Sequence, residues 1–303
     1  MRVDEHTFQL DDSPIYYRSA DAPGMPKLYL HGIPTSSDDW VECLARTGGI
    51  APDLIGFGRS GKGGHLDYSL DGLADFVDRF LAHVGVNGLL QVVAHDWGAP
   101  VALTFARRHV GRVRRLVILN APPALPGFEW PRLFRLWRTP LVGELLMGAT
   151  TERLLARTLR RGSVRPDAWP DERIAAVWQQ FDQGTQRAIL RLVRSATDDV
   201  IGDGGPRPPE GTGADAPRPP EGTGADAPRP PEGAGADGPP PSYDATETTI
   251  VWGEQDPWYP PALPDAYAAR LPGATVERVA GAGHWPWLDR PEVVDRVAAL
   301  LEG

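Results

Sequence analysis

The sequence predicts an α/β fold in which a doubly wound, mostly parallel sheet carries helices on both faces. Short apolar stretches rich in Val, Ile and Leu alternate with helical stretches along residues 1–121. The same alternation resumes over residues 243–303, after an interruption that contains no strand signal. Buried strands that alternate with amphipathic helices are typical of parallel sheets built from βαβ units.

The first part of the core, residues 1–121, is expected to open with a β-hairpin. The stretches "HTFQL" and "PIYYRSA" flank Asp11-Asp12-Ser13, a typical turn sequence. Further strands are expected in "PKLYLHG", "GGIAPDLIGFGRSG", "LLQVVAHD" and "VRRLVILN", and a helix in "APVALTFARRH". A second helix is predicted in "SLDGLADFVDRFLAHVG", because its apolar residues fall on one face: Leu70, Leu73, Phe76, Val77, Phe80, Leu81 and Val84.

A helical cap domain is predicted for residues 122–201, inserted into the α/β core. Its segments, such as "ERLLARTLRR" and "DERIAAVWQQF", have helical periodicity. The second part of the core, residues 243–303, is then expected to supply the strands "TTIVWGE" and "TVERVAG" and the helices "LPDAYAARL" and "PEVVDRVAALLE".

A low-complexity insertion separates the cap from the second part of the core, at residues 202–242. "PRPPEGTGADA" occurs at 206–216 and again at 217–227, and "PRPPEGAGADG" follows at 228–238. Proline and glycine dominate, so we expect a disordered, partly polyproline II segment. It is either a docking segment for a partner with an aromatic groove or a tolerated surface expansion. The small entropic cost of lengthening a loop favours the expansion.

Composition excludes several classes of function. The net charge of −9 argues against a nucleic-acid partner. No stretch of 18 apolar residues is present, so no membrane span is expected, and the N-terminus has charges where a signal peptide needs an apolar run. The single cysteine, Cys43, is expected to be a small buried hydrophobe and is typical of a reducing compartment, so we expect a cytoplasmic location.

Three polar residues follow expected strands, at the sheet edge where ligands bind in doubly wound folds. Asp96 follows "LLQVV", Asp256 follows "TIVWGEQ", and His284 in "GAGHW" follows "TVERVA". Their order along the chain matches a nucleophile, an acid and a base.

The residues around Asp96 are typical of a sharp strand-to-helix elbow. Ala94 and Gly98 lie two residues before and after it, which leaves room for the turn. A carboxylate is ionised at neutral pH, so it attacks carbon without a base, and a histidine is needed only to activate water afterwards. The alternative is that Asp96 is a simple helix N-cap.

These motifs resemble the α/β-hydrolase superfamily, in the branch that has an aspartate nucleophile: haloalkane dehalogenases and epoxide hydrolases. "HGIPTSS", "GFGRSGK", "HDWGA", "WGEQDPW" and "GAGHW" carry the resemblance, which covers nearly all of 1–121 and 248–303. The helical insertion corresponds to the cap domain of that family.

The resemblance implies a role for five residues. Asp96 would displace a leaving group and form an alkyl ester, His284 would activate the water that hydrolyses it, and Asp256 would orient His284. The backbone N–H groups of Ile33 and Trp97 would form the oxyanion hole, and the Trp97 indole would bind a halide. The partners would be a small apolar substrate and water, and neither a cofactor nor a metal is expected.

Two features of the sequence bear on the leaving group. Epoxide hydrolases of this type use two cap tyrosines, but residues 121–241 contain none, which favours a haloalkane dehalogenase. Many dehalogenases have Asn after "HG", where this chain has Ile33; others use a cap tryptophan, for which the sequence offers Trp130, Trp137, Trp169 and Trp178. Epoxide hydrolysis by the same three residues is one alternative, and a ligand receptor without catalytic activity is another.

Overall fold

A single sheet of eight strands forms the centre of the molecule, in the order β1-β2-β4-β3-β5-β6-β7-β8. The computed structural model describes residues 1–196 and 246–302. Pairs β1·β2 and β2·β4 are antiparallel, and all the other pairs are parallel. The strands are β1 (Asp4–Leu10), β2 (Ser13–Ala20), β3 (Lys27–Leu30), β4 (Gly49–Pro52), β5 (Leu90–His95), β6 (Val113–Leu119), β7 (Glu247–Gly253) and β8 (Thr275–Val279).

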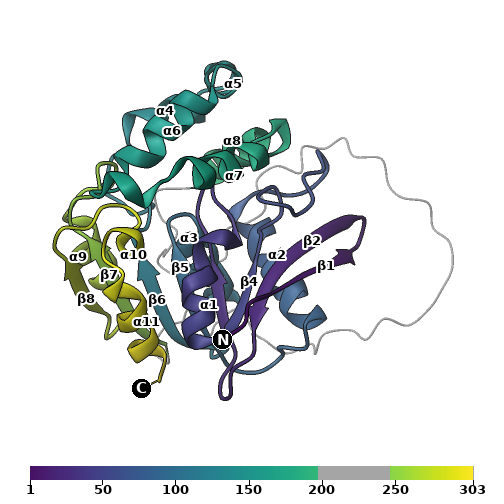
Figure 1. The fold of residues 1–303 in the computed structure, drawn as a ribbon, viewed down its shortest axis with the longest axis vertical. Coiled ribbons are helices and arrows are strands. Elements are labelled where there is room, and N and C mark those ends of the chain that lie inside the picture. The colour runs from purple at the N-terminus through teal and green to yellow at the C-terminus, as the bar shows by residue number, and fades with distance from the viewer. Residues whose placement is uncertain (197–245, 303) are drawn as a thin grey trace, which may run out of the picture.

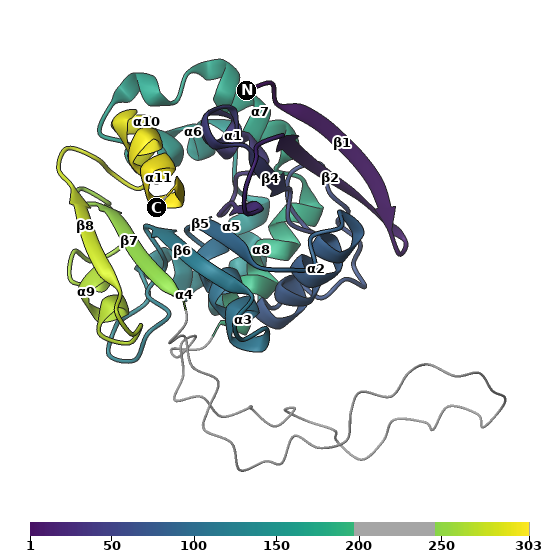
Figure 2. The ribbon, with the colours of Figure 1, turned by 90° about the horizontal axis from the view of Figure 1, so that it is seen from below.

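Helices cover both faces of this sheet, as the sequence predicts. Figure 2 shows α1 (Val41–Thr47) and α11 (Glu292–Glu302) on one side and α2 (Leu70–His83) and α3 (Gly98–Arg108) on the other. A 3₁₀ turn, η1 (Ser37–Trp40), precedes α1, while α9 (Leu263–Ala268) packs on β7 and β8 and α10 (Pro286–Asp289) precedes α11. With helices on both faces, the central strand β5 is buried along its whole length, which explains the apolar run Val92-Val93-Ala94 at its centre.

Helix α2 illustrates how the sequence sets an element. The Ser69 side chain caps its first turn by accepting from the Gly72 N–H at 3.0 Å. Its predicted apolar face is buried, except that Val84, just past the last helical residue, is half-buried. The chain then turns at Gly85, which has φ = 78°.

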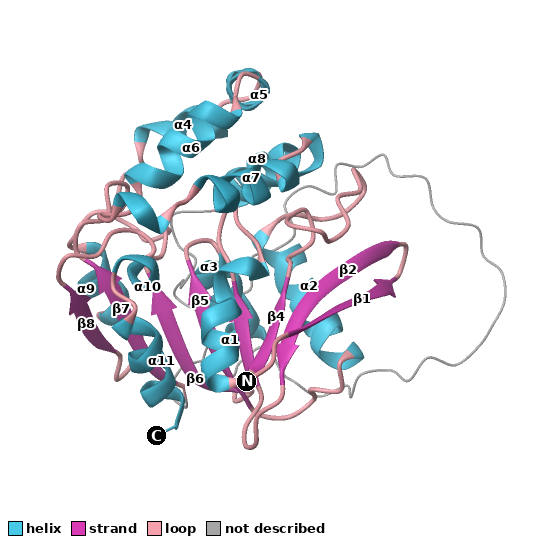
Figure 3. Ribbon diagram, in the orientation of Figure 1, coloured by secondary structure: helices cyan, strands magenta, loops and turns pink. Residues whose placement is uncertain are grey.

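Five helices and a 3₁₀ turn, here called the cap helices, lie between β6 and residue 196, above the carboxyl ends of the strands (Figure 1). They are α4 (Arg132–Arg138), α5 (Val142–Gly148), α6 (Glu152–Arg161), η2 (Pro166–Ala168), α7 (Asp171–Gln180) and α8 (Gln183–Ser195). Within 122–196 the chain forms helices and loops without a strand (Figure 3). The division into a separate cap domain at 122–201 remains a prediction.

Two further expectations concern the chain as a whole. The Pro/Gly-rich insertion predicted at 202–242 lies outside the described residues. Among the helices that the structure describes, none combines the length and the apolar character needed to cross a bilayer.

Candidate active site

Asp96 lies at a strained turn between β5 and α3. Its φ of 48° is in the left-handed region, which a non-glycine residue adopts only when its surroundings impose it. A Cβ on Gly98 would lie 2.5 Å from the Leu30 carbonyl oxygen, and one on Gly32 would lie 2.4 Å from the Asp96 Cβ. The turn therefore requires glycine at both positions, and it directs Asp96 toward the loop that follows β3.

The two carboxylate oxygens of Asp96 have different partners. Oδ2 accepts a hydrogen bond of 2.9 Å from the backbone N–H of Ile33. Oδ1 accepts a hydrogen bond from the Tyr259 hydroxyl and lies 3.8 Å from His284 Nε2. The oxygen at the predicted oxyanion hole is therefore distinct from the oxygen beside the predicted base.

His284 and Asp256 form the other half of the site. His284 Nδ1 lies 2.8 Å from Asp256 Oδ2, which leaves Nε2 facing Asp96. Asn120, at the end of β6, donates from Nδ2 to the same Asp256 oxygen at 2.8 Å. The backbone N–H groups of Trp258 and Tyr259 donate to Asp256 Oδ1 at 2.9 and 3.2 Å. Asp256 is thus held by four donors, and it fixes the plane of the imidazole.

The backbone of His284 is also fixed on both sides. Its N–H donates to the Gly162 carbonyl of the cap helices at 2.7 Å. Its carbonyl accepts from Nε2 of His95, the residue before Asp96, at 2.8 Å. His95 does not line the cavity.

Burial and neighbouring charges shift the pKa values of this cluster. Burial raises the pKa of Asp96 above its usual range, although His284, Tyr259 and the N–H groups of Ile33 and Trp97 act in the opposite direction. Burial alone would lower the pKa of His284, but the charge and hydrogen bond of Asp256, with the charge of Asp96, raise it above its ordinary value. The backbone N–H groups of Ile33 and Trp97 thus both act to lower the pKa of this carboxyl group, and their role as oxyanion donors remains a prediction.

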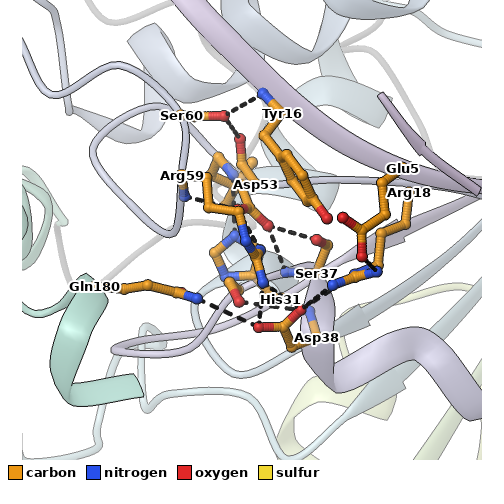
Figure 4. Close-up of polar contacts among 12 residues, drawn as sticks. Glu5, Tyr16, Arg18, His31, Ser37, Asp38, Asp53, Arg59, Ser60 and Gln180 are labelled. Carbon is orange, nitrogen blue, oxygen red and sulfur yellow. Dashed lines mark hydrogen bonds and ion pairs between the residues drawn. The ribbon is translucent and has the colours of Figure 1, made fainter. Parts of the chain in front are cut away.

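A network of ion pairs supports the loop that carries Ile33 (Figure 4). Asp53 is buried and accepts from the N–H and hydroxyl of Ser37 at 2.8 and 2.5 Å. Arg59 bridges Asp53 and Asp38, at 3.0 and 2.5 Å, and Arg18 also binds Asp38 at 2.7 Å. These contacts hold the first turn after the "HGIPT" segment against the loop that follows β4.

His31 belongs to this scaffold. Its Nε2 accepts from the Leu54 N–H at 3.0 Å, so Nδ1 carries the proton that it donates to the Gly32 carbonyl at 2.7 Å. Both ring nitrogens are occupied by backbone groups, which agrees with a structural role for this residue.

A cavity of about 220 Å³ lies between the site and the cap helices. Asp96, Tyr259 and His284 line its floor, and its walls are mainly apolar side chains of the cap, among them Leu133, Phe134, Trp137, Leu146, Met147 and Leu155. A carboxylate at the bottom of an apolar cavity suits a small, neutral, apolar substrate. Among the described residues no group of three or more His, Cys, Asp or Glu side chains is arranged to hold a metal ion.

The tryptophans occupy different places. The Trp97 indole is buried and stacks on Trp130, with ring centroids 5.7 Å apart, and it is not among the residues that line the cavity. Its N–H has no hydrogen-bond partner among the described residues, and its halide-binding role remains a prediction. Of the four cap tryptophans, Trp137 lines the cavity; Trp169 packs on Trp285 and Trp178 on Phe181.

Sequence reasoning missed Tyr259. The tyrosines expected of an epoxide hydrolase belong to the cap, whereas Tyr259 lies in the loop after β7. Its position three residues after Asp256 was the available signal, because Asp side chains often accept backbone N–H groups two and three residues further on. Such a turn places the Tyr259 ring beside His284, at 5.2 Å between centroids.

Part of this chain is similar in sequence to curated proteins. A haloalkane dehalogenase of Mesorhizobium japonicum is 36% identical over 149 residues, which are 45% of this chain and 47% of the relative. A cis-3-alkyl-4-alkyloxetan-2-one decarboxylase of Xanthomonas campestris is 32% identical over 139 residues, 41% of this chain and 46% of the relative. The matches span about half the length of these curated relatives.

Solved structures extend the likeness over the whole chain. A haloalkane dehalogenase of Bradyrhizobium elkani has a TM-score of 0.74 at 23% identity, with 100% of this chain and 98% of that chain covered. The profile of the alpha/beta hydrolase fold family matches residues 28–291, from β3 into the turn before α11. The chain therefore belongs to the alpha/beta hydrolase fold family.

Proposed function

We propose that this protein is a hydrolase that cleaves the carbon–halogen bond of a small apolar haloalkane and gives an alcohol and a halide. The observation that carries the proposal is the buried Asp96 carboxylate at the floor of an apolar cavity, with Oδ2 on a backbone N–H and Oδ1 beside His284. The curated haloalkane dehalogenases among its relatives support the choice of leaving group.

The first step of the proposed reaction is a displacement at carbon. Asp96 Oδ1 attacks the carbon that bears the halogen, the carbon–halogen bond breaks, and the halide leaves with the bonding electrons. The product is an ester between Asp96 and the alkyl group. Because the walls of the cavity are apolar, the attacking carboxylate is poorly solvated, and this favours displacement.

Hydrolysis of the ester is the second step. His284 Nε2 removes a proton from water, and the hydroxide attacks Cγ of Asp96. The negative charge that develops on Oδ2 is stabilised by the backbone N–H groups of Ile33 and Trp97, while Asp256 stabilises the imidazolium. The alcohol then leaves.

A cytoplasmic location, inferred from the single cysteine, belongs to the same proposal.

Epoxide hydrolysis through the same ester ranks second. Backside attack places the departing oxygen on the far side of the carbon from Asp96, so its proton donor must lie across the cavity from the nucleophile. Tyr259 contacts Asp96 Oδ1 itself and so does not occupy that position. The sequence has no tyrosine between residues 121 and 241.

The test is a panel of 1-bromobutane, 1-chlorobutane and styrene oxide, assayed in parallel for halide and for diol. We expect bromide and butanol from 1-bromobutane. In a His284→Phe variant the ester should accumulate, and mass spectrometry should find a butyl group on the peptide that contains Asp96. Diol without halide would replace the proposal by epoxide hydrolysis, and tight binding without turnover of either class would support a receptor.

A further inference from the structure

The fates of the two Asp96 oxygens differ in the reaction proposed above. Oδ2 stays on the enzyme as the carbonyl oxygen of the ester. Oδ1 becomes the oxygen bonded to the alkyl group. When hydroxide attacks Cγ, the bond that must break is Cγ–Oδ1, so Oδ1 leaves as the oxygen of the alcohol. The leaving group of the second step is therefore the atom to which the Tyr259 hydroxyl donates.

We propose that Tyr259 is a catalytic residue of ester hydrolysis and protonates the departing alkoxide at Oδ1. The inference rests on the proposed Asp96 ester. It assigns Tyr259 to the second step alone, since in the first step the leaving group is a halide on the opposite side of the carbon.

Ester hydrolysis transfers one proton from water to His284 and another from Tyr259 to the departing oxygen. His284 takes one proton from the attacking water and becomes an imidazolium. As the Cγ–Oδ1 bond breaks, its electron pair stays on Oδ1, which takes the hydroxyl proton of Tyr259. The resulting phenolate recovers a proton from the imidazolium. The second proton of water stays on the newly formed carboxyl group of Asp96 and passes to solvent when that group ionises. The charge of Asp96, which helps to raise the pKa of Tyr259 in the resting enzyme, is absent from the ester. An alkoxide is more basic than a phenolate, so the proton moves from Tyr259 to the departing oxygen.

Two contacts hold Tyr259 in place for this role. Its side chain is buried, and its backbone N–H donates to Asp256 Oδ1 at 3.2 Å. Its ring packs edge-on against His284, with centroids 5.2 Å apart. The loop after β7 thus positions both Asp256, which orients His284, and Tyr259, which donates to the departing oxygen.

The hydrogen bond is compatible with the first step. A carboxylate oxygen has two lone pairs, so Oδ1 can accept from Tyr259 with one and attack with the other. Burial, together with the charge of Asp96, raises the pKa of Tyr259 well above its usual range, so the hydroxyl keeps its proton in the resting enzyme. Removal of the hydroxyl should leave Oδ1 at least as nucleophilic as before.

The decisive experiment is single-turnover kinetics of a Tyr259→Phe variant with 1-bromobutane. We expect a burst of about one bromide per protein at the wild-type rate or faster, followed by slow butanol release. A lost general acid slows its step about 10²- to 10⁴-fold, so the butyl ester on Asp96 should accumulate. A Tyr267→Phe variant is the matched control. It removes another buried phenol, one that donates to the Pro122 carbonyl at 2.7 Å, and it should not accumulate ester.

The outcomes separate this inference from the proposed function. If His284→Phe accumulates the ester and Tyr259→Phe hydrolyses it at the wild-type rate, the role of Tyr259 is refuted and the ester mechanism stands. A slower bromide burst in Tyr259→Phe, without ester, would mean that the phenol only positions Asp96, and it would also overturn the inference. If neither variant forms the ester, both the proposed function and the inference fail.

Discussion

His95 and His284 are joined by a hydrogen bond of 2.8 Å from the His95 Nε2 to the His284 backbone carbonyl. Burial, and to a smaller extent the nearby His284 ring, lowers the pKa of His95 well below its usual value, so its ring is neutral. A neutral ring that donates from Nε2 has no proton on Nδ1, which has no partner among the described residues. Because His95 precedes Asp96, this bond fixes the spacing between the nucleophile and the base.

A His95→Phe variant should therefore lose both stability and activity. The ring volume is kept, but the buried carbonyl of His284 loses its donor, which costs about 1–3 kcal/mol. We expect urea unfolding to show a decrease of this size in the free energy of unfolding. Ester hydrolysis should slow more than bromide release does. His95→Gln retains an N–H donor and should recover part of both losses. Equal effects of Phe and Gln would contradict the role assigned to the bond.

The pH dependence of ester hydrolysis should report His284. Only the neutral imidazole removes a proton from water, so the rate should rise with pH through the pKa of His284. That pKa lies above the ordinary histidine value because of Asp256. The rising limb of the pH–rate profile should therefore lie above the pH at which a free histidine titrates. Single-turnover rates of ester hydrolysis measured from pH 5 to 9 test this.

An Asp256→Asn variant should shift the rising limb of this pH–rate profile to lower pH. Without the charge that stabilises the imidazolium, the pKa of His284 falls and the limb shifts to lower pH. The plateau rate should also fall, by up to about 10⁴-fold, because an amide no longer fixes the required tautomer. Bromide release in the first turnover should be much less affected. A limb that stays in place would show that the titrating group is not His284.

Sequence reasoning located the parts of the site that strand ends determine. Asp96, Asp256 and His284 follow β5, β7 and β8, and parallel strands bring their carboxyl ends to one edge of the sheet. The elbow glycine was also predictable, because a turn at positive φ leaves no room for a side chain beside the strand. Tyr259 was not predicted, since its contact depends on the path of a loop and on the rotamer of one side chain.

The orientation of the tryptophans was likewise beyond the sequence. Trp97 directly follows Asp96, so the sequence predicts that its backbone N–H lies near the Asp96 carboxylate. Its indole packs on Trp130, a partner from the cap that no local pattern indicates. Contacts between core and cap join residues far apart in the chain, and helical periodicity gives only the face of each helix, not its neighbour.

Asp38 should make stability depend on pH in the acidic range. Burial opposes ionisation of Asp38, but Arg59 and Arg18 outweigh it and lower its pKa from 3.8 to about 2. A pKa that is lower in the folded state gives stability that is present above about pH 4 and is lost as the pH falls toward 2. Its side chain is 32% exposed, so solvent screening reduces the contribution to about 1 kcal/mol.

An Asp38→Asn variant tests this by urea unfolding at pH 7 and at lower pH. The wild type should be more stable by about 1 kcal/mol at pH 7, and the difference should shrink as the pH is lowered below 4. Asp71→Asn removes an exposed ion pair with Arg108 and should change stability by less than about 0.5 kcal/mol at either pH. A difference that is independent of pH would contradict the assignment.

Asp289 joins the loop that carries His284 (residues 280–285, the base loop) to the cap through three backbone hydrogen bonds. Oδ1 accepts from Val164 and Arg165 at 2.9 and 3.0 Å, and Oδ2 accepts from Gly283, next to His284, at 2.7 Å. An Asp289→Asn variant replaces one of the two acceptor oxygens by an NH₂ group that faces a backbone N–H. Because the site is buried, both the NH₂ group and that backbone N–H are then left without an acceptor. We expect a loss of about 2–3 kcal/mol in the free energy of unfolding.

The loss should reach the chemistry through His284, because Gly283 is its neighbour and the same cap segment holds its backbone N–H. Ester hydrolysis should slow more than bromide release, since only the second step needs the base. Asp265→Asn removes an exposed ion pair with Arg278 and is the matched control, with an expected change within about 0.5 kcal/mol. If Asp289→Asn lowers stability while both steps keep their rates, the base loop does not depend on the cap, and Asp289 serves the fold alone.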